Sequence, residues 1–211
     1  MNPLKHLARA VLVLLLLFCC LARAQQPAAT EDEVKAAFLY KFLDFVQWPA
    51  DARAAGAIVI GVMNDDAVEV ALRRYVELKR DRGPTVVVRS IASPEQADGV
   101  HILFIGRREN ARLPRILAGV KGKPVLVVTD SLDALERGAI INFIVTDRVR
   151  FEIAIDNAAQ AGLHLNARLL SVAVRVKKSE GMFQPTLFAD TDAGAPFWCT
   201  MHFSCGSPRR S

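Results

Sequence analysis

The sequence has 211 residues, a formal net charge of +5 and 52% hydrophobic residues. So small a basic excess, with no dense basic stripe interleaved with aromatics, argues against nucleic acid as a partner. The length suits one domain with a substantial hydrophobic core.

Residues 1–24 show the features of a secretory signal peptide in their usual order. Lys5 and Arg9 come first, an apolar run from Val11 to Leu21 follows, and Ala22-Arg23-Ala24 supplies a cleavage site. The apolar run is shorter than the roughly 20 residues that a membrane-spanning helix needs. Removing this segment takes away three basic residues and no acidic ones, so the net charge would fall to +2. We expect export to the periplasm.

The first helix of the mature chain is predicted to begin at Thr30 and to end before Trp48-Pro49. Thr30 and Glu33 have the spacing of a capping box. The helix would have two different faces. An apolar stripe is formed by Val34, Phe38, Leu39, Phe42, Phe45 and Val46, and the other side carries Tyr40, Lys41, Asp44 and Gln47.

Strands and helices alternate in the next part of the chain. Continuous apolar runs predict buried strands, and apolar residues at helical spacing predict helices between them. The predicted strands are Ala57–Met63, Thr85–Arg89, Val100–Ile105 and Val125–Thr129, and the predicted helices are Ala67–Lys79, Arg107–Ala118 and Ser131–Arg137. This alternation predicts an α/β fold with a mostly parallel sheet flanked by helices.

The alternation ends in a predicted antiparallel hairpin. Ile140–Val145 and Val149–Ile155 are both strand-like, and the three residues between them are too few for a parallel crossover. A turn of helix through Gln160 and a last helix over Asn166–Lys178 would follow, the latter with Val172 and Val176 toward the core.

Beyond Ser179 the sequence is rich in glycine, proline and polar residues, which is typical of a flexible tail. The predicted organisation is therefore a signal peptide at 1–24, a single α/β domain at 25–179 and a flexible tail at 180–211. Within the tail, Cys199 and Cys205 are five residues apart, and in an oxidising compartment we expect a disulfide between them. A metal site shared with His202 would need a fourth ligand, and unpaired thiols are the remaining alternative.

No motif for catalysis or cofactor binding is present. The sequence lacks a phosphate-binding glycine pattern, His-Glu-x-x-His and Gly-x-Ser-x-Gly. His101 precedes an apolar strand, where a hydrogen-bonded core imidazole is the expected role rather than that of a catalytic base. We therefore predict neither enzymatic activity nor a cofactor nor a metal.

Four side chains are candidates for recognition of a partner or ligand: Tyr40, Trp48, Arg150 and Arg168. Aromatic and arginine side chains contribute strongly to binding at protein interfaces. The alternatives are that Trp48 belongs to the core and that Arg150, with Glu152, is a solvated residue on the polar face of the hairpin.

Several blocks, taken in order, resemble the YfiR family of periplasmic proteins over roughly residues 33–176. The first block runs from Ala36 past Phe42 to Trp48-Pro49, and the next two are Ile58 to Val62 and His101 to Ile105. The fourth begins with Ile141-Asn142-Phe143 and ends with Val149–Ile153, and the last is Asn166 to Leu170. The resemblance implies a non-enzymatic protein that represses a membrane-anchored diguanylate cyclase by binding its periplasmic sensor domain. Cyclic-di-GMP signalling and biofilm formation would then be lowered.

The same resemblance implies further partners, namely an outer-membrane lipoprotein that releases the repressor and a second copy of the chain in a homodimer. Some family members carry disulfides within the folded domain. This chain has no cysteine between Gln25 and Trp198, so we do not expect redox control there. The alternative function is that of a periplasmic small-molecule-binding protein, with its ligand at the carboxyl edge of the parallel sheet.

Overall fold

The computed structural model describes residues 29–50, 52, 56–81 and 83–178. The predicted signal peptide, the tail and the Cys199–Cys205 disulfide lie outside these residues. None of the helices in the described ranges has the length and apolar character required to cross a membrane.

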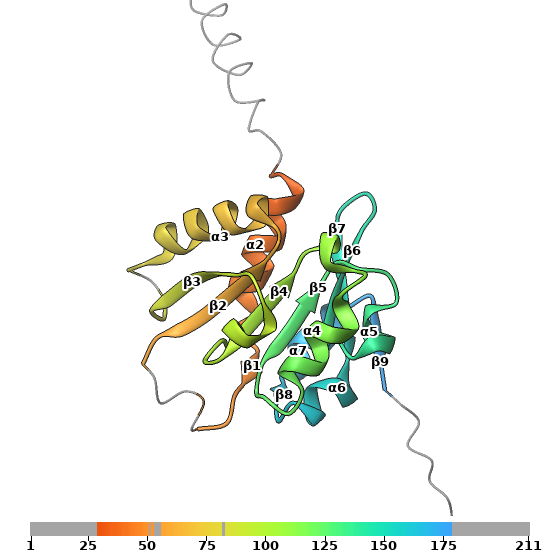
Figure 1. Ribbon diagram of the computed structural model, residues 1–211. Helices are drawn as coiled ribbons and strands as arrows, with labels where there is room; N and C mark the ends of the chain where they lie inside the picture. Colours follow the sequence, from red (N-terminus) through yellow and green to blue (C-terminus); the bar gives the residue numbers. More distant parts are fainter. Residues whose placement is uncertain (1–28, 51, 53–55, 82, 179–211) are drawn as a thin grey trace, which may run out of the picture. The chain divides into compact units, whose positions relative to one another are not determined.

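Seven strands form one sheet in the order β3-β2-β4-β5-β6-β7-β9 (Figure 1). The strands are β2 (Ile58–Met63), β3 (Val86–Ile91), β4 (Ile102–Ile105), β5 (Leu126–Thr129), β6 (Ile141–Val145), β7 (Val149–Ala154) and β9 (Arg175–Lys177). Strands β6 and β7 pair antiparallel, and all the other neighbours in this sheet pair parallel. The expected mostly parallel sheet with an antiparallel hairpin is confirmed.

Helices cover both faces of the sheet. One core includes residues of α2 (Glu31–Phe42), α3 (Asp66–Lys79), α6 (Ile155–Gln160) and α7 (Ala167–Val172). The opposite core includes residues of η1 (Pro94–Ala97), α4 (Leu113–Val120) and α5 (Ala134–Arg137), and the short helix η2 (Arg107–Glu109) follows β4. In Figure 1, α4 and α5 lie in front of the sheet and α2 lies behind it.

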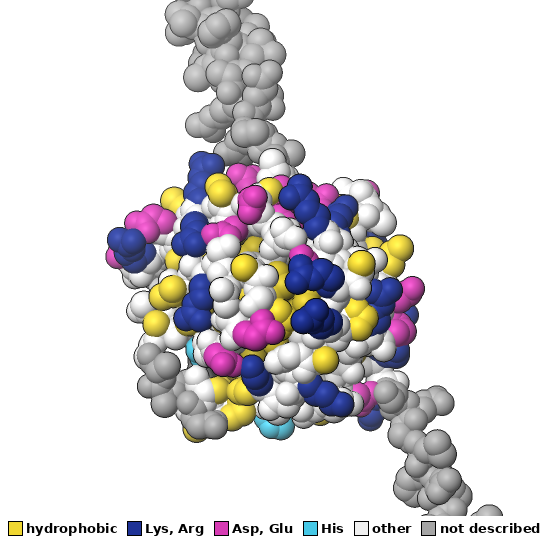
Figure 2. Space-filling view, viewed as in Figure 1, with side chains coloured by type: hydrophobic (Ala, Val, Ile, Leu, Met, Phe, Trp, Pro, Cys, Tyr) yellow, Lys and Arg dark blue, Asp and Glu magenta, His cyan; other side chains and the backbone are white. Residues whose placement is uncertain are grey.

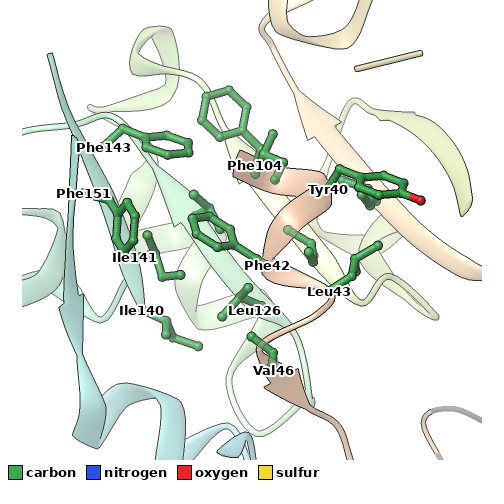
Figure 3. Close-up of a cluster of buried hydrophobic side chains, with 14 of the residues drawn as sticks. Tyr40, Phe42, Leu43, Val46, Phe104, Leu126, Ile140, Ile141, Phe143 and Phe151 are labelled. Atoms are coloured by element: carbon green, nitrogen blue, oxygen red, sulfur yellow. The ribbon is translucent and has the colours of Figure 1, made fainter. Parts of the chain in front are cut away.

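Aromatic side chains join α2 to the hairpin. The ring of Phe42 lies 5.4 Å from that of Phe151 and 6.1 Å from that of Phe143, and Phe104 of β4 lies 6.1 Å from Phe143. Figure 3 shows Phe42 directed from α2 toward these rings. Because aromatic side chains bury large apolar areas, this cluster fixes α2 against the hairpin half of the sheet.

The N-terminal helix begins as predicted but is shorter than predicted. The capping box is confirmed, since Thr30 N–H donates to Glu33 Oε2 at 3.0 Å and Glu33 N–H donates to Thr30 Oγ1 at 3.3 Å. The helix ends at Phe42, and Val46–Gln47 form strand β1, which pairs antiparallel with β8 (His164–Leu165). Strands of two residues are too short to produce a detectable sequence period.

The predicted helix over Asn166–Lys178 was wrong in its second half. Helix α7 ends at Val172, and β9 then adds a parallel strand next to β7, with Val176 opposite Ile153. Val172 and Val176 are exposed rather than buried in the core. The segment satisfies its backbone groups at the edge of the sheet, and this pairing overrides the local helical pattern.

The predicted helix over Arg107–Ala118 also differs, because α4 begins only at Leu113. Pro114 then lies in the first turn of α4, where a proline costs no helical hydrogen bond. Arg107–Glu109 form η2 instead. This places Arg107 two residues after the end of β4, at the carboxyl edge of the parallel strands.

Candidate functional site

An apolar groove of about 560 Å³ runs along the outer side of α2. Three parts of the chain line it: α2 forms the floor, α3 forms one wall, and β7 with α7 forms the other wall. Its apolar lining includes Val34, Phe38 and Phe42 of α2, Ala71, Tyr75 and Leu78 of α3, and Phe151, Leu169 and Val172 of β7 and α7. The groove is thus built from segments that are far apart in the sequence.

Exposed aliphatic side chains lie on opposite sides of this groove. Leu78 is 73% exposed and Val172 is 65% exposed, while Phe38 between them is only partly buried. Phe38 is held in place by Phe151 and Phe143, whose ring centroids lie 5.4 and 6.0 Å away. A preformed apolar surface with a rigid aromatic floor is typical of a site that binds another molecule.

Charged side chains also line the groove, namely Glu33, Lys41 and Arg74. Arg74 lies 3.9 Å from Glu33, and Lys41 Nζ donates to Asp44 Oδ2 at 3.1 Å. The bond to Asp44 raises the pKa of Lys41, so this side chain remains a cation. An apolar centre with polar side chains around it is the usual composition of a protein–protein interface.

Two of the four predicted recognition residues are buried. Tyr40 and Trp48 are each 6% exposed, so the expected location of Tyr40 on the non-core side of the helix was wrong, and the alternative that Trp48 belongs to the core is confirmed. The ring of Tyr40 packs edge-on against Tyr75 at 5.4 Å, and Trp48 Nε1–H donates to the backbone oxygen of His101 at 3.2 Å. Their predicted role in binding stays a prediction.

The two arginines lie in different places. Arg168 is exposed on α7, next to Leu169, which lines the groove. Arg150 is exposed and donates to Asp147 Oδ1 at 2.7 Å in the hairpin turn. Because neighbouring residues of a strand point to opposite faces, Arg150 lies on the other face of β7 from Phe151 and the groove. Recognition by either arginine stays a prediction.

The interpretation of Glu152 as a solvated residue was wrong. Glu152 is buried, and its Oε1 accepts from Asn142 Nδ2 at 2.9 Å while its Oε2 accepts from Arg175 Nε at 2.6 Å. The three residues occupy neighbouring register positions on β6, β7 and β9. This polar row was not predicted, because the sequence did not indicate that β9 would pair with β7.

A network of ion pairs lies at the carboxyl edge of the parallel strands. Lys35 Nζ of α2 is 2.6 Å from both Asp130 Oδ2 and Glu31 Oε1, and Arg107 reaches the same two carboxylates at 3.2 and 3.1 Å. Burial disfavours the charged form of Lys35, but its bonds to Asp130 and Glu31 outweigh this effect and raise its pKa. The charge of Asp130 likewise raises the pKa of Arg107. Both basic groups therefore act as fixed cations that position the carboxylates.

His101 is a core residue, as predicted. Its Nδ1 accepts from the backbone N–H of Val59 at 3.1 Å, so Nε2 carries the proton and donates to the backbone oxygen of Ala52 at 2.9 Å. Both ring nitrogens are thereby occupied. Across the described ranges, His, Cys, Asp and Glu side chains do not assemble into a group of three that could hold a metal ion.

Basic, acidic and apolar side chains are interspersed over the face of the molecule that carries α4 and α5 (Figure 2). The groove lies over α2 and belongs to the other face of the sheet. The groove combines a largely apolar lining with exposed aliphatic side chains, and it is therefore our candidate functional site.

Comparison with known proteins gives a family match. A family model described as YfiR/HmsC-like matches residues 32–174. A solved structure, that of a conserved domain protein from Vibrio cholerae O1 biovar El Tor strain N16961, is similar with a TM-score of 0.46 and 14% sequence identity. The similarity covers 69% of this chain but only 60% of that protein. No curated protein sequence matches this one.

Proposed function

The chain belongs to the YfiR/HmsC-like family, and we propose that it represses a membrane-anchored diguanylate cyclase by binding the periplasmic sensor domain of that cyclase. Membership of this family implies a periplasmic regulator of diguanylate cyclase signalling. The direction of regulation, the partner and the binding surface are the proposal. Lower cyclic-di-GMP and less biofilm would be its consequences in the cell.

The observation that carries this proposal is the apolar groove along α2. Leu78 and Val172 expose most of their side chains to water on either side of it. Covering such side chains stabilises a complex by about 25 cal/mol for each Å² of apolar surface removed from water. An exposed apolar surface lowers the solubility of a folded protein, and such surfaces usually mark sites where another protein binds.

The geometry of the groove indicates how the partner would bind. Phe38 and Phe42 form a floor that is already packed against the sheet, so little side-chain entropy would be lost on binding. An apolar side chain or the apolar face of a helix from the sensor domain would insert between Leu78 and Val172. The charged residues Glu33, Lys41 and Arg74 would then surround the buried contact and set its orientation.

This binding mode explains how a protein could regulate an enzyme by contact alone. A ligand that binds one conformation of a receptor more tightly shifts the population toward it. The groove would favour the conformation of the sensor domain that keeps the cyclase inactive. Homodimerisation and release by an outer-membrane lipoprotein stay predictions from the family resemblance.

The proposal is tested in the cell of origin. The gene is deleted and restored as wild type, as Leu78→Asp with Val172→Asp, or as Val70→Asp, and cyclic-di-GMP and biofilm are measured. Val70 is the matched control, because it is an exposed valine of α3 that does not line the groove. We expect deletion to raise the level of cyclic-di-GMP, and we expect the wild-type gene and Val70→Asp to return it to its original value. The groove variant should fail to do so. Unchanged cyclic-di-GMP after deletion would reject the proposed function.

A further inference from the structure

A second cavity, of about 380 Å³, lies at the carboxyl edge of the sheet, away from the groove. Its polar lining includes Arg107, Asp130, Ser131 and Asn142. Asp130 directly follows β5, and Asn142 of β6 is the register partner of Thr129. In open α/β sheets this edge is where ligands usually bind.

Two buried oxygen atoms on these residues lack a hydrogen-bond donor from the described part of the chain. They are Asp130 Oδ1 and Asn142 Oδ1. The Asp130 side chain is 1% exposed and Asn142 is 5% exposed. Buried acceptors are nearly always paired in folded proteins, so these two atoms indicate that a donor is supplied from outside the described part of the chain.

Both oxygen atoms are held in fixed positions by their neighbours. Asp130 Oδ2 accepts from Lys35 Nζ at 2.6 Å and from Arg107 Nε at 3.2 Å, which fixes the plane of the carboxylate. Asn142 Nδ2 donates to Glu152 Oε1 at 2.9 Å. A carboxylate can only accept, so the amide nitrogen must face Glu152 and Asn142 Oδ1 must point away from it.

The remaining polar groups define what the ligand must provide. Ser131 Oγ accepts from Thr129 Oγ1 at 3.2 Å, and its own hydroxyl hydrogen remains free to donate. Two fixed acceptors, one of them a carboxylate oxygen, match a group with several N–H donors and a positive charge. We propose that this cavity binds a small molecule through a primary ammonium group, whose hydrogens bond to Asp130 Oδ1 and Asn142 Oδ1.

This inference goes beyond the proposed function and does not depend on it. Amino acids and simple polyamines both offer a primary ammonium group. Only an amino acid also brings a carboxylate, for which Arg107 is the available cation in the cavity wall. Comparing the two classes of probe therefore also tests whether Arg107 takes part in recognition.

The test is calorimetric titration of the purified protein, in a buffer free of amines, with L-alanine, L-serine, ethanolamine and putrescine. Wild type is compared with Asn142→Leu, Ser131→Ala and the groove variant Leu78→Asp. Glu152 keeps Arg175 as a partner in Asn142→Leu, so this variant should fold. Loss of a bond to an ammonium group should weaken binding at least about tenfold in Asn142→Leu.

Each outcome supports or contradicts the binding of a primary ammonium group in this cavity. We expect at least one probe to bind saturably to wild type and to Leu78→Asp, and less tightly to Asn142→Leu. NMR should show a shift of the Asn142 side-chain amide signals on binding. If Asn142→Leu fails to fold, the presence or absence of that shift in the wild type decides. Absence of saturable binding up to about 10 mM probe overturns the inference, as does equal affinity in all variants. Neither result bears on repression through the groove.

Discussion

Lys35 and Asp130 are 95 residues apart in the sequence, yet Lys35 Nζ lies 2.6 Å from Asp130 Oδ2 with both side chains almost completely buried. This pair joins the first turns of α2 to the carboxyl end of β5. Because α2 also forms the floor of the groove, the ion pair fixes the position of the candidate functional site relative to the sheet.

Replacing Lys35 by methionine should destabilise the fold. Removal of one partner from a buried ion pair leaves the other charge uncompensated and costs about 3–5 kcal/mol. Arg107 still faces Asp130 in the variant, so we expect a loss near the lower end, about 3 kcal/mol, in the free energy of unfolding by urea. In a double-mutant cycle, Lys35→Met with Asp130→Leu should cost less than the sum of the single changes. Additive losses would contradict a direct interaction.

Replacing Gly61 by alanine should disturb the packing of the core next to β2. A Cβ atom at this position of β2 would lie 2.8 Å from Ile91 Cγ1 and 3.2 Å from Val100 Cγ1. Overpacking of this kind costs about 1–3 kcal/mol of folding free energy. In an Ile91→Ala background the nearest atom is absent, so the added cost of Gly61→Ala should be smaller. Equal costs in both backgrounds, measured by urea unfolding, would show that Ile91 is not the obstacle.

Asp65 should make the stability of the protein depend on pH. It caps α3 by accepting from the Val68 N–H at 3.1 Å, and burial raises the pKa of its carboxyl above the usual value for an aspartate. The folded state therefore holds this proton more tightly than the unfolded chain. Protonated Asp65 stabilises the folded state fully at pH values below the pKa that this carboxyl has in the unfolded chain. This stabilisation is lost as the pH rises through the higher pKa of the folded state.

Asparagine caps helices about as well as aspartate but does not ionise. Asp65→Asn should therefore gain stability relative to wild type as pH rises from about 3 to about 7, with a constant difference above the raised pKa. Urea midpoints across this range provide the measurement. Asp65→Ser, a second neutral cap, should give the same pH trend. A stability difference that is independent of pH, or one that shrinks as pH rises, would contradict the role of burial.

The sheet was predictable because its strands carry strong local signals. The apolar run before Asn64 has the length and β-branched content of a buried strand, and the three residues between β6 and β7 exclude a parallel return. Strand β9 was missed because Arg175–Lys177 has no strand pattern of its own. Its conformation depends on β7, a neighbour that the local sequence does not reveal.

The groove was only partly predictable. The apolar stripe of α2 was expected to be core, and Phe42 is indeed 1% exposed, but Phe38 and Phe45 are only partly buried and line the groove. Periodicity shows which side of a helix is apolar, yet it does not show whether the rest of the chain covers that side. The structure likewise leaves Leu78 of α3 exposed.

Acidic substitutions at the groove should leave the fold intact. Leu78 and Val172 are already exposed, so Leu78→Asp and Val172→Asp should each change the free energy of unfolding by no more than about 0.5 kcal/mol. Phe42→Ala, which removes a buried ring of α2, should cost about 3–5 kcal/mol. Large destabilisation by the surface changes, measured by urea unfolding, would indicate that these residues support the core instead.

The most direct test of the account is calorimetric binding between this protein and the periplasmic sensor domains of the membrane-anchored diguanylate cyclases encoded in the same genome. We predict that one of these domains binds the wild type and Val70→Asp equally, and that Leu78→Asp with Val172→Asp weakens this binding at least about a hundredfold, as expected for the centre of an interface. Equal affinity of the groove variant and the wild type would contradict docking at the groove. Absence of binding to every sensor domain would contradict repression by direct contact.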